Sequence, residues 1–199
     1  MVLGIVGGRT HGDVSRKAFD ALISQFHTWY RVRDAAVREI HTTIQAVTHA
    51  ERKASYLQGA LRMITAKRQD LMLEFLRTWQ VDRALSWLEQ LPGVGRKTSA
   101  ATLNFSYLRM KALVIDTHHM RVLRRLGIIG VRSNTVKAYD QVMPYLPADW
   151  TALDLDNHHQ LIKLLGQKTC RHAIPVCRSC PLSDLCPTAS TGLRRANDA

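Results

Sequence analysis

Four cysteines carry the most distinctive chemistry in this chain, and they lie close together in sequence. Their order is Cys170-x6-Cys177-x2-Cys180-x5-Cys186, and residues 1–169 contain no cysteine. Thiolates at this spacing can surround a single centre, either a zinc ion or an iron–sulfur cluster. Two disulfides would instead require an oxidising compartment, of which the sequence gives no sign. We therefore expect one metal-binding loop here.

A tight turn is the second feature with a chemical use. Residues 91–98 read Leu-Pro-Gly-Val-Gly-Arg-Lys-Thr, between two segments of helical pattern. Gly93 and Gly95 permit backbone angles closed to other residues, so the turn can be very sharp. The amides that open the next helix can then hold a phosphate together with the positive helix end. Taken alone, such a turn is more often a plain connector.

The turn, an aspartate motif and the cysteine loop occur in an order that is informative. Asp116 follows Lys97 after 18 intervening residues, in the segment Val-Ile-Asp-Thr-His-His-Met-Arg-Val. From Asp82 to Cys186 the sequence closely resembles the endonuclease III branch of the helix-hairpin-helix DNA glycosylase superfamily. The resemblance implies a [4Fe-4S] cluster held by the four cysteines, with zinc as the alternative. It also implies that segment 91–98 is the DNA-binding hairpin.

The resemblance further implies a reaction centre made of Lys97 and Asp116. The Lys97 amine would attack the deoxyribose C1′ as the damaged base leaves, and Asp116 would stabilise positive charge on the sugar. A Schiff base then forms, and elimination cuts the strand. Burial, the helix start and Arg96 favour the neutral amine that this needs, whereas Asp116 opposes it. The plain alternative is a surface lysine and an aspartate that caps the helix at Thr117.

Contacts with DNA are expected from several parts of the chain. A glycosylase flips its target nucleotide out of the duplex, and side chains must fill the space left behind. The family uses a glutamine and a bulky apolar residue, but the matching positions here are Gly8 or Arg9 and His49, with Thr48 where a glycine is common. These departures leave the lesion and the opposing base open. The residues expected to contact DNA are Gly93, Val94, Gly95, Arg96, Thr98, Arg9, His49, Arg121, Arg171 and Arg178.

Residues around the cysteines are expected to support the same task. Lys168, Arg171, His172 and Arg178 would form a positive lip that meets the DNA backbone. The pair at 158–159 resembles the family's histidines before the cluster, and we interpret it as packing support. Family members also carry residues before the apolar helix that begins here at Met1, and these pack against the cluster lobe. A reduced lobe or a late start predicts lower stability and exposed apolar surface near the cluster.

Composition agrees with a polyanionic partner. Lysine and arginine number 28 against 16 acidic residues, a formal net charge of +12. Such an excess favours nucleic acid as the partner. A basic surface that keeps the protein in solution, or one that binds a membrane surface, would have the same excess of positive charge. No run of about 18 apolar residues exists, and the first residues lack the features of a secretory signal. We expect a cytoplasmic, nucleoid-associated monomer that binds double-stranded DNA with a damaged base or abasic site.

Helical periodicity predicts an essentially all-helical, two-lobed fold. The stretch Ala112–Ile115 has the composition of a strand, but no partner of matching pattern lies nearby. We expect a helical, barrel-like lobe over 1–112 that contains the hairpin, a cluster lobe over 113–187, and a disordered tail over 188–199. The predicted helices are 13–27, 32–47, 51–67, 81–91, 97–108, 117–126, 135–145 and 157–167.

The sequence therefore predicts a base-excision repair glycosylase with AP lyase activity, which removes oxidised pyrimidines from duplex DNA. One alternative is a monofunctional uracil, adenine or mismatch glycosylase in which Asp116 activates water, and the presence of Lys97 counts against it. The other is a non-catalytic helix-hairpin-helix protein that only binds DNA. Two features motivate that alternative: the unusual residues Arg9 and His49, and the lack of the family's N-terminal segment. Retention of both reaction-centre residues opposes it.

Overall fold

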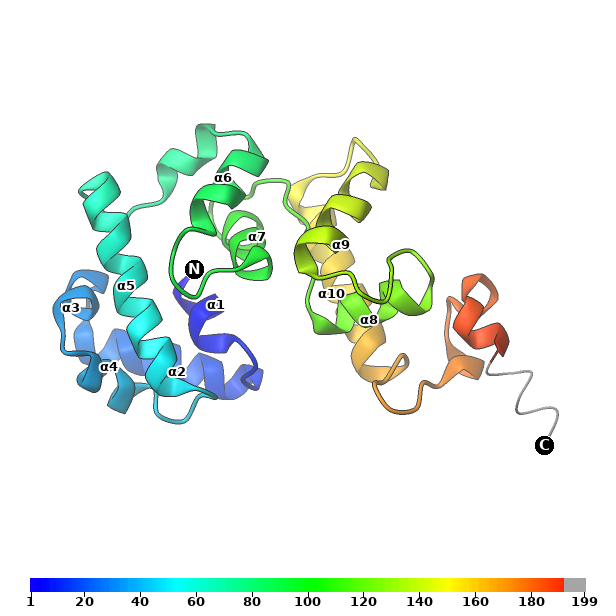
Figure 1. Cartoon of the computed structure of the whole chain (residues 1–199), viewed down its shortest axis with the longest axis horizontal. Coiled ribbons are helices and arrows are strands. Elements are labelled where there is room, and N and C mark those ends of the chain that lie inside the picture. The colour runs from blue at the N-terminus through cyan, green and yellow to red at the C-terminus, as the bar shows by residue number, and fades with distance from the viewer. Residues whose placement is uncertain (192–199) are drawn as a thin grey trace. The chain divides into compact units, whose positions relative to one another are not determined.

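Every regular element in the described part of the chain, residues 1–191, is helical in the computed structural model (Figure 1). The all-helical class is thus confirmed, and residues 112–115 are extended without joining a sheet. No described helix is long and apolar enough to span a membrane. The main helices are α1 (Val2–Gly7), α2 (Gly12–Phe26), α3 (Trp29–Asp34), α4 (Val37–Thr43), α5 (Ala50–Arg68), α6 (Val81–Leu88), α7 (Arg96–Phe105), α8 (Thr117–Arg125), α9 (Thr135–Val142) and α10 (Ala152–Lys168).

Two of the predicted helices differ from the observed ones by more than three residues at an end. The helix expected over 32–47 is interrupted, because α3 ends at Asp34 and α4 starts only at Val37. Ala36 is extended, and its amide donates to the Glu39 carboxylate at 3.2 Å, which starts a new helix. Helix α10 begins five residues earlier than the expected 157, because Thr151 and Asp154 form a capping box. Both differences come from local capping, which hydrophobic periodicity does not report.

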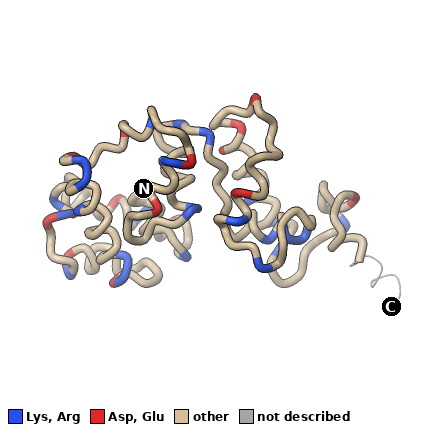
Figure 2. Tube along the Cα trace, turned by 45° about the horizontal axis from the view of Figure 1, so that its top comes forward, with Lys and Arg blue, Asp and Glu red and all other residues tan. Residues whose placement is uncertain are grey.

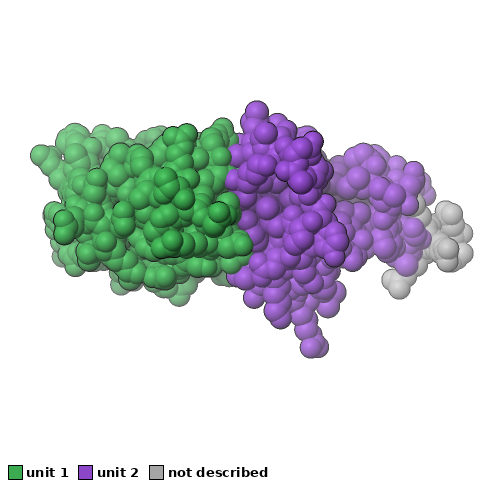
Figure 3. Space-filling model, turned by 90° about the horizontal axis from the view of Figure 1, so that it is seen from above, with its two compact units in different colours: residues 1–110 green, residues 111–199 purple. Residues whose placement is uncertain are grey.

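The chain divides into two compact units, Met1–Met110 and Lys111–Ala199 (Figure 3). In the first unit the long helix α5 packs against α1, α3 and α4. Its Leu57, Leu61 and Ile64 are at most 2% exposed and form the centre of this core. Helix α2 packs against α1, α3 and α4, and the unit also contains the 3-10 helix η1 (Glu74–Thr78) and the helices α6 and α7, which the hairpin joins.

The second unit is built on the packing of α8 against α10. The helices approach closely at Gly166, where an added Cβ would lie 2.9 Å from the Cβ of His118. Apolar side chains are exposed on α10 and in the cysteine loop, among them Leu161, Leu164 and Ile174. Residues 187–191, the last described segment, are helical, so the start of the expected tail is ordered. The rest of that tail, residues 192–199, lies outside the described residues.

The hairpin turn is held against α5. Gly93 has a φ of 75°, a left-handed conformation that favours glycine. A Cβ added there would lie 2.9 Å from both Cβ and Cδ2 of Tyr56, so the turn packs directly on this aromatic side chain. Gly95 differs, because its φ is −105° and no atom lies within 4 Å of an added Cβ. Of the two glycines, Gly93 is the one that the fold requires.

Gly93→Ala should therefore destabilise the first unit by about 1–3 kcal/mol, through backbone strain and the clash with Tyr56. Gly95→Ala is the matched control and should cost less than about 1 kcal/mol. Urea unfolding of the three proteins, followed by circular dichroism, measures the difference. Equal destabilisation by the two substitutions would contradict this account of the turn.

Candidate functional site

Lys97 is the second residue of α7 and follows the hairpin directly. Its side chain is half-buried, and its neighbours Thr98 and Val94 are 8% and 5% exposed. Gly93 and Gly95 are exposed, so the turn offers its backbone to solvent while Val94 anchors it in the core. An amine at this position lies at the positive end of the helix.

An ion pair braces the hairpin beside Lys97. The Arg96 Nε donates to Glu89 Oε1 at 2.5 Å, and Ser99 Oγ donates to the same oxygen at 2.9 Å. The Arg96 and Glu89 side chains are 12% and 23% exposed, so water screens them weakly. Sequence reasoning assigned Arg96 to DNA and to lowering the Lys97 pKa, and it missed Glu89. In the structure the guanidinium holds the end of α6 to the start of α7, and Glu89 offsets its charge.

Asp116 is the N-cap of α8. Its Oδ1 accepts a hydrogen bond from the His119 amide at 2.8 Å, which leaves Oδ2 outside the cap. The capping interaction that the sequence offered as an alternative is thus present. It does not exclude a chemical role, because the cap fixes one carboxylate oxygen and thereby orients the other. Lys97 and Asp116 belong to different units, the first to Met1–Met110 and the second to Lys111–Ala199.

A histidine cluster fixes the segment that leads to Asp116. The Val114 carbonyl accepts from His119 Nδ1 at 3.2 Å and from His159 Nδ1 at 2.6 Å. The His119 and His158 rings lie 5.2 Å apart. His119 is fully buried, and burial, followed by the charges of the two neighbouring histidines, lowers its pKa to about 4. Sequence reasoning identified 158–159 as packing support but missed His119, which no spacing distinguishes from a surface residue.

This cluster predicts that acid destabilises the second unit. His119 binds its proton less readily when folded than when unfolded, so its contribution to stability is complete above about pH 6.5 and declines towards pH 4. Between pH 7.5 and pH 5, His119 alone should cost about 2 kcal/mol. Urea unfolding at both pH values measures the loss. His119→Gln keeps a donor for Val114 but does not titrate, and an unchanged pH dependence in this variant would refute the assignment.

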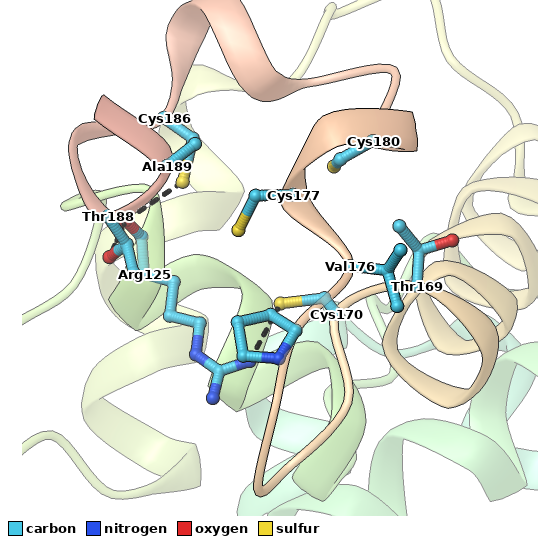
Figure 4. Close-up of a pocket in the computed structure, with 10 residues that line it drawn as sticks. Arg125, Thr169, Cys170, Val176, Cys177, Cys180, Cys186, Thr188 and Ala189 are labelled. Atoms are coloured by element: carbon cyan, nitrogen blue, oxygen red, sulfur yellow. Dashed lines mark hydrogen bonds between the residues drawn. The ribbon is translucent and has the colours of Figure 1, made fainter. Parts of the chain in front are cut away.

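The four cysteines line one cavity in the second unit (Figure 4). The Arg125 Nη1 donates to Cys170 Sγ at 3.2 Å, and Cys186 Sγ donates to the Arg125 carbonyl at 3.3 Å. Burial, and then the other three cysteines, raise the pKa of the Cys177 thiol. Within residues 1–191 no three His, Cys, Asp or Glu side chains are close enough to bind a single metal ion. The thiols nevertheless face a common space, and a guanidinium beside them suits an anionic group.

Two arginines of α8, Arg121 and Arg125, hold the cysteine loop through hydrogen bonds. The Arg121 Nε donates to the Cys170 carbonyl at 2.9 Å and its Nη2 to the Gly166 carbonyl at 2.6 Å. The Arg125 guanidinium donates to the carbonyls of Arg171 and His172. Arg121 was expected to contact DNA, but the structure commits its guanidinium to backbone carbonyls. Sequence could not reveal this, because a basic residue on a helix surface has the same pattern in either role.

The remaining expected DNA contacts are exposed. Arg171 and Arg178 lie on the surface of the cysteine loop, and Arg9 and His49 lie on the surface of the first unit. Lysine and arginine residues are present on both units (Figure 2). Arg9 and His49 share an unusual backbone, with φ values of 56° and 58°. Such angles are uncommon outside glycine and mark local strain that the surroundings must maintain.

Comparison with known proteins gives consistent relatives. No protein-family model matches the chain. It is 30% identical to endonuclease III of Bacillus subtilis over 182 residues, which cover 87% of this chain and 76% of the relative. It is 28% identical to endonuclease III of Sulfolobus acidocaldarius over 156 residues, which cover 78% of this chain but only 65% of that relative.

A solved structure has the same fold. It is described as a trapped endonuclease III–DNA covalent intermediate in an estranged-adenine complex. The TM-score is 0.78 at 22% identity, with 97% of this chain and 84% of the other covered. The expected two-lobed glycosylase fold is thereby confirmed.

Proposed function

The chain belongs to the endonuclease III family, and from this membership we propose that it is a base-excision repair DNA glycosylase with AP lyase activity. Its proposed substrate is duplex DNA with an oxidised pyrimidine or an abasic site. Its proposed location is the nucleoid. One observation carries the proposal: Lys97 is the second residue of a helix that directly follows an exposed, glycine-rich turn. The amine of Lys97 is therefore attached next to a turn whose backbone can bind phosphate, and it lies at the positive N-terminal end of α7.

The proposed chemistry assigns one step to each residue. The Lys97 amine attacks C1′ of the deoxyribose, the bond to the base breaks, and the base leaves with the electron pair and takes up a proton. The Asp116 carboxylate stabilises the positive charge that develops on the sugar. Ring opening gives a Schiff base between Lys97 and C1′. Loss of a proton from C2′ then expels the 3′ phosphate, and water releases the enzyme.

DNA binding is proposed to rest on the backbone more than on side chains. The backbone of the exposed Gly93 and Gly95 can hold a phosphate without reading sequence, which suits an enzyme that must find lesions anywhere. The Val94 amide between them donates to the Leu91 carbonyl at 3.1 Å. The net charge of +12 adds a long-range attraction to the duplex. Arg171 and Arg178 are the exposed cations of the cysteine loop and extend this contact.

A [4Fe-4S] cluster is proposed for the cavity of the four cysteines. The fit rests on the donor set, because four thiols line one space and the Arg125 guanidinium donates to Cys170 Sγ. When bound, the cluster supplies cross-links that hold the loop in one conformation. The loop's own residues then present Arg171 and Arg178 at fixed positions.

Replacement of Lys97 by alanine should reduce borohydride trapping of a covalent DNA adduct by about 1000-fold or more, because the amine that forms the Schiff base is gone. The assay is gel separation of protein–DNA adducts on a panel of damaged and abasic duplexes, read together with base release and nicking. Lys17→Ala removes an exposed lysine of α2 and serves as control. A wild-type chain that forms no adduct on any duplex would sink the lyase assignment.

Asp116→Asn separates the two roles of this residue within the same assay. Asparagine caps a helix as well as aspartate does, so stability should change little. The negative charge is lost, so trapping and base release should fall together. If trapping and base release stay at the wild-type level in Asp116→Asn, Asp116 is only a cap.

The cluster predicts a broad absorbance band near about 400 nm and roughly four iron atoms per chain. Cys177→Ser should abolish both, since one thiolate ligand is lost. Zinc without iron in the purified protein would overturn the cluster and favour a mononuclear site. Absorbance and elemental analysis are independent of enzyme activity, so this outcome does not depend on the lyase.

A further inference from the structure

A lysine lies buried in the first unit at a position that the proposed chemistry does not use. Lys53 of α5 is only 7% exposed. Its Nζ donates to the Val6 carbonyl at 2.7 Å and to Thr10 Oγ1 at 2.8 Å. The Val6 carbonyl is in the last turn of α1, where helix carbonyls lack partners and attract cations. Lys53 thus joins α5 to the end of α1 and to the turn after it.

The Thr10 hydroxyl is the centre of this arrangement. It accepts from Lys53 Nζ at 2.8 Å and from the Thr48 amide at 3.1 Å, and it donates to the Gly8 carbonyl at 3.4 Å. A hydroxyl has one donor and two acceptor positions, so all three are used. Two loops that lie 38 residues apart in sequence are therefore tied together through one oxygen.

The two tied loops carry the strained residues described above. Arg9 lies between Gly8 and Thr10, and His49 follows Thr48. Both are exposed and both have positive φ, a conformation that is strained for a non-glycine residue. Such strain persists only where surrounding contacts determine the backbone, and the hydrogen bonds of Thr10 and Lys53 are the contacts next to each residue.

The electrostatics also indicate a positioning role. Among residues 1–191 no carboxylate forms an ion pair with Lys53, and burial lowers its pKa. A buried ammonium is costly unless its protons are hydrogen-bonded, so the Val6 and Thr10 oxygens are what make it tolerable. The same bonds restrain the two loops. An apolar side chain in this place would fill the core, but it would remove the bonds from α5 to the Val6 carbonyl and to Thr10 Oγ1, and the Thr10–Thr48 bond would lose their support.

We propose that Lys53 and Thr10 form a latch that fixes the Arg9 and His49 loops as one rigid wedge, which enters the duplex when the target nucleotide is flipped out. The inference rests on the proposed glycosylase function. Lys53 and Thr10 are positioning residues, because they act through the two loops and touch no reacting atom. If the two loops moved independently, each binding event would have to order them, and this loss of conformational entropy would weaken binding to the duplex.

The test compares duplex DNA with single-stranded DNA, because a single strand has no unpaired partner base and no space to fill. Lys53→Met and Thr10→Val should reduce borohydride trapping on an abasic duplex by about 10- to 100-fold. Trapping on the same abasic strand without its complement should stay within about twofold of wild type. Thr10→Ser keeps the hydroxyl and Lys17→Met removes an exposed lysine, so both should behave as wild type.

A second readout needs binding but no chemistry. With 2-aminopurine opposite an uncleavable abasic analogue, wild-type binding should raise fluorescence as the base unstacks, and Lys53→Met and Thr10→Val should lose most of that rise. The latch is overturned if both variants match wild type on duplex, or if they lose single-strand trapping equally.

A thermal melt shows whether Lys53→Met is folded. If it is not, Thr10→Val alone tests the latch, because this variant keeps the Lys53–Val6 hydrogen bond. A wild-type chain that traps neither substrate contradicts the proposed function instead. The fluorescence rise still decides the latch in that case.

Discussion

The left-handed turn at Gly93 is the constraint on which the hairpin depends. Tyr56 occupies the space that a side chain at Gly93 would need, so α5 dictates where the chain reverses between α6 and α7. The start of α7 is then fixed, and the Arg96–Glu89 ion pair holds it there. The contact of Gly93 with Tyr56 and the Arg96–Glu89 ion pair therefore determine the position of Lys97. Its proposed reactivity is therefore a property of the packing beneath the turn as much as of the lysine itself.

The second unit positions its functional residues by the same means. Gly166 lets α10 approach α8 at His118, and the Val114 carbonyl receives His119 and His159 from these two helices. The segment before Asp116 is thereby fixed, and the cap holds one carboxylate oxygen. The α8 arginines extend this order to the cysteine loop through its backbone carbonyls. In both units, buried or partly buried polar groups thus orient the residue proposed for catalysis: Lys97 in the first unit and Asp116 in the second.

Sequence alone predicted most helices and the residues proposed for catalysis, because periodicity and motif order are local signals. It did not predict the break at Ala36 or the helix start at Thr151. At both places a side chain caps the helix, and the hydrophobic pattern contains no sign of such a cap. It also assigned Arg96 and Arg121 to DNA, since charge on a helix surface does not reveal a nearby carboxylate or carbonyl. His119 and Lys53 were missed for the converse reason: polar types are expected outside, and only tertiary contacts show that these two are buried.

The central claim is that the amine of Lys97 forms the covalent bond to DNA. The most direct measurement is to trap the adduct on an abasic duplex with borohydride, digest it, and locate the modified peptide by mass spectrometry. The account predicts that the sugar remnant is attached to Lys97, in the peptide that begins the helix after the hairpin. Attachment to any other residue would contradict it.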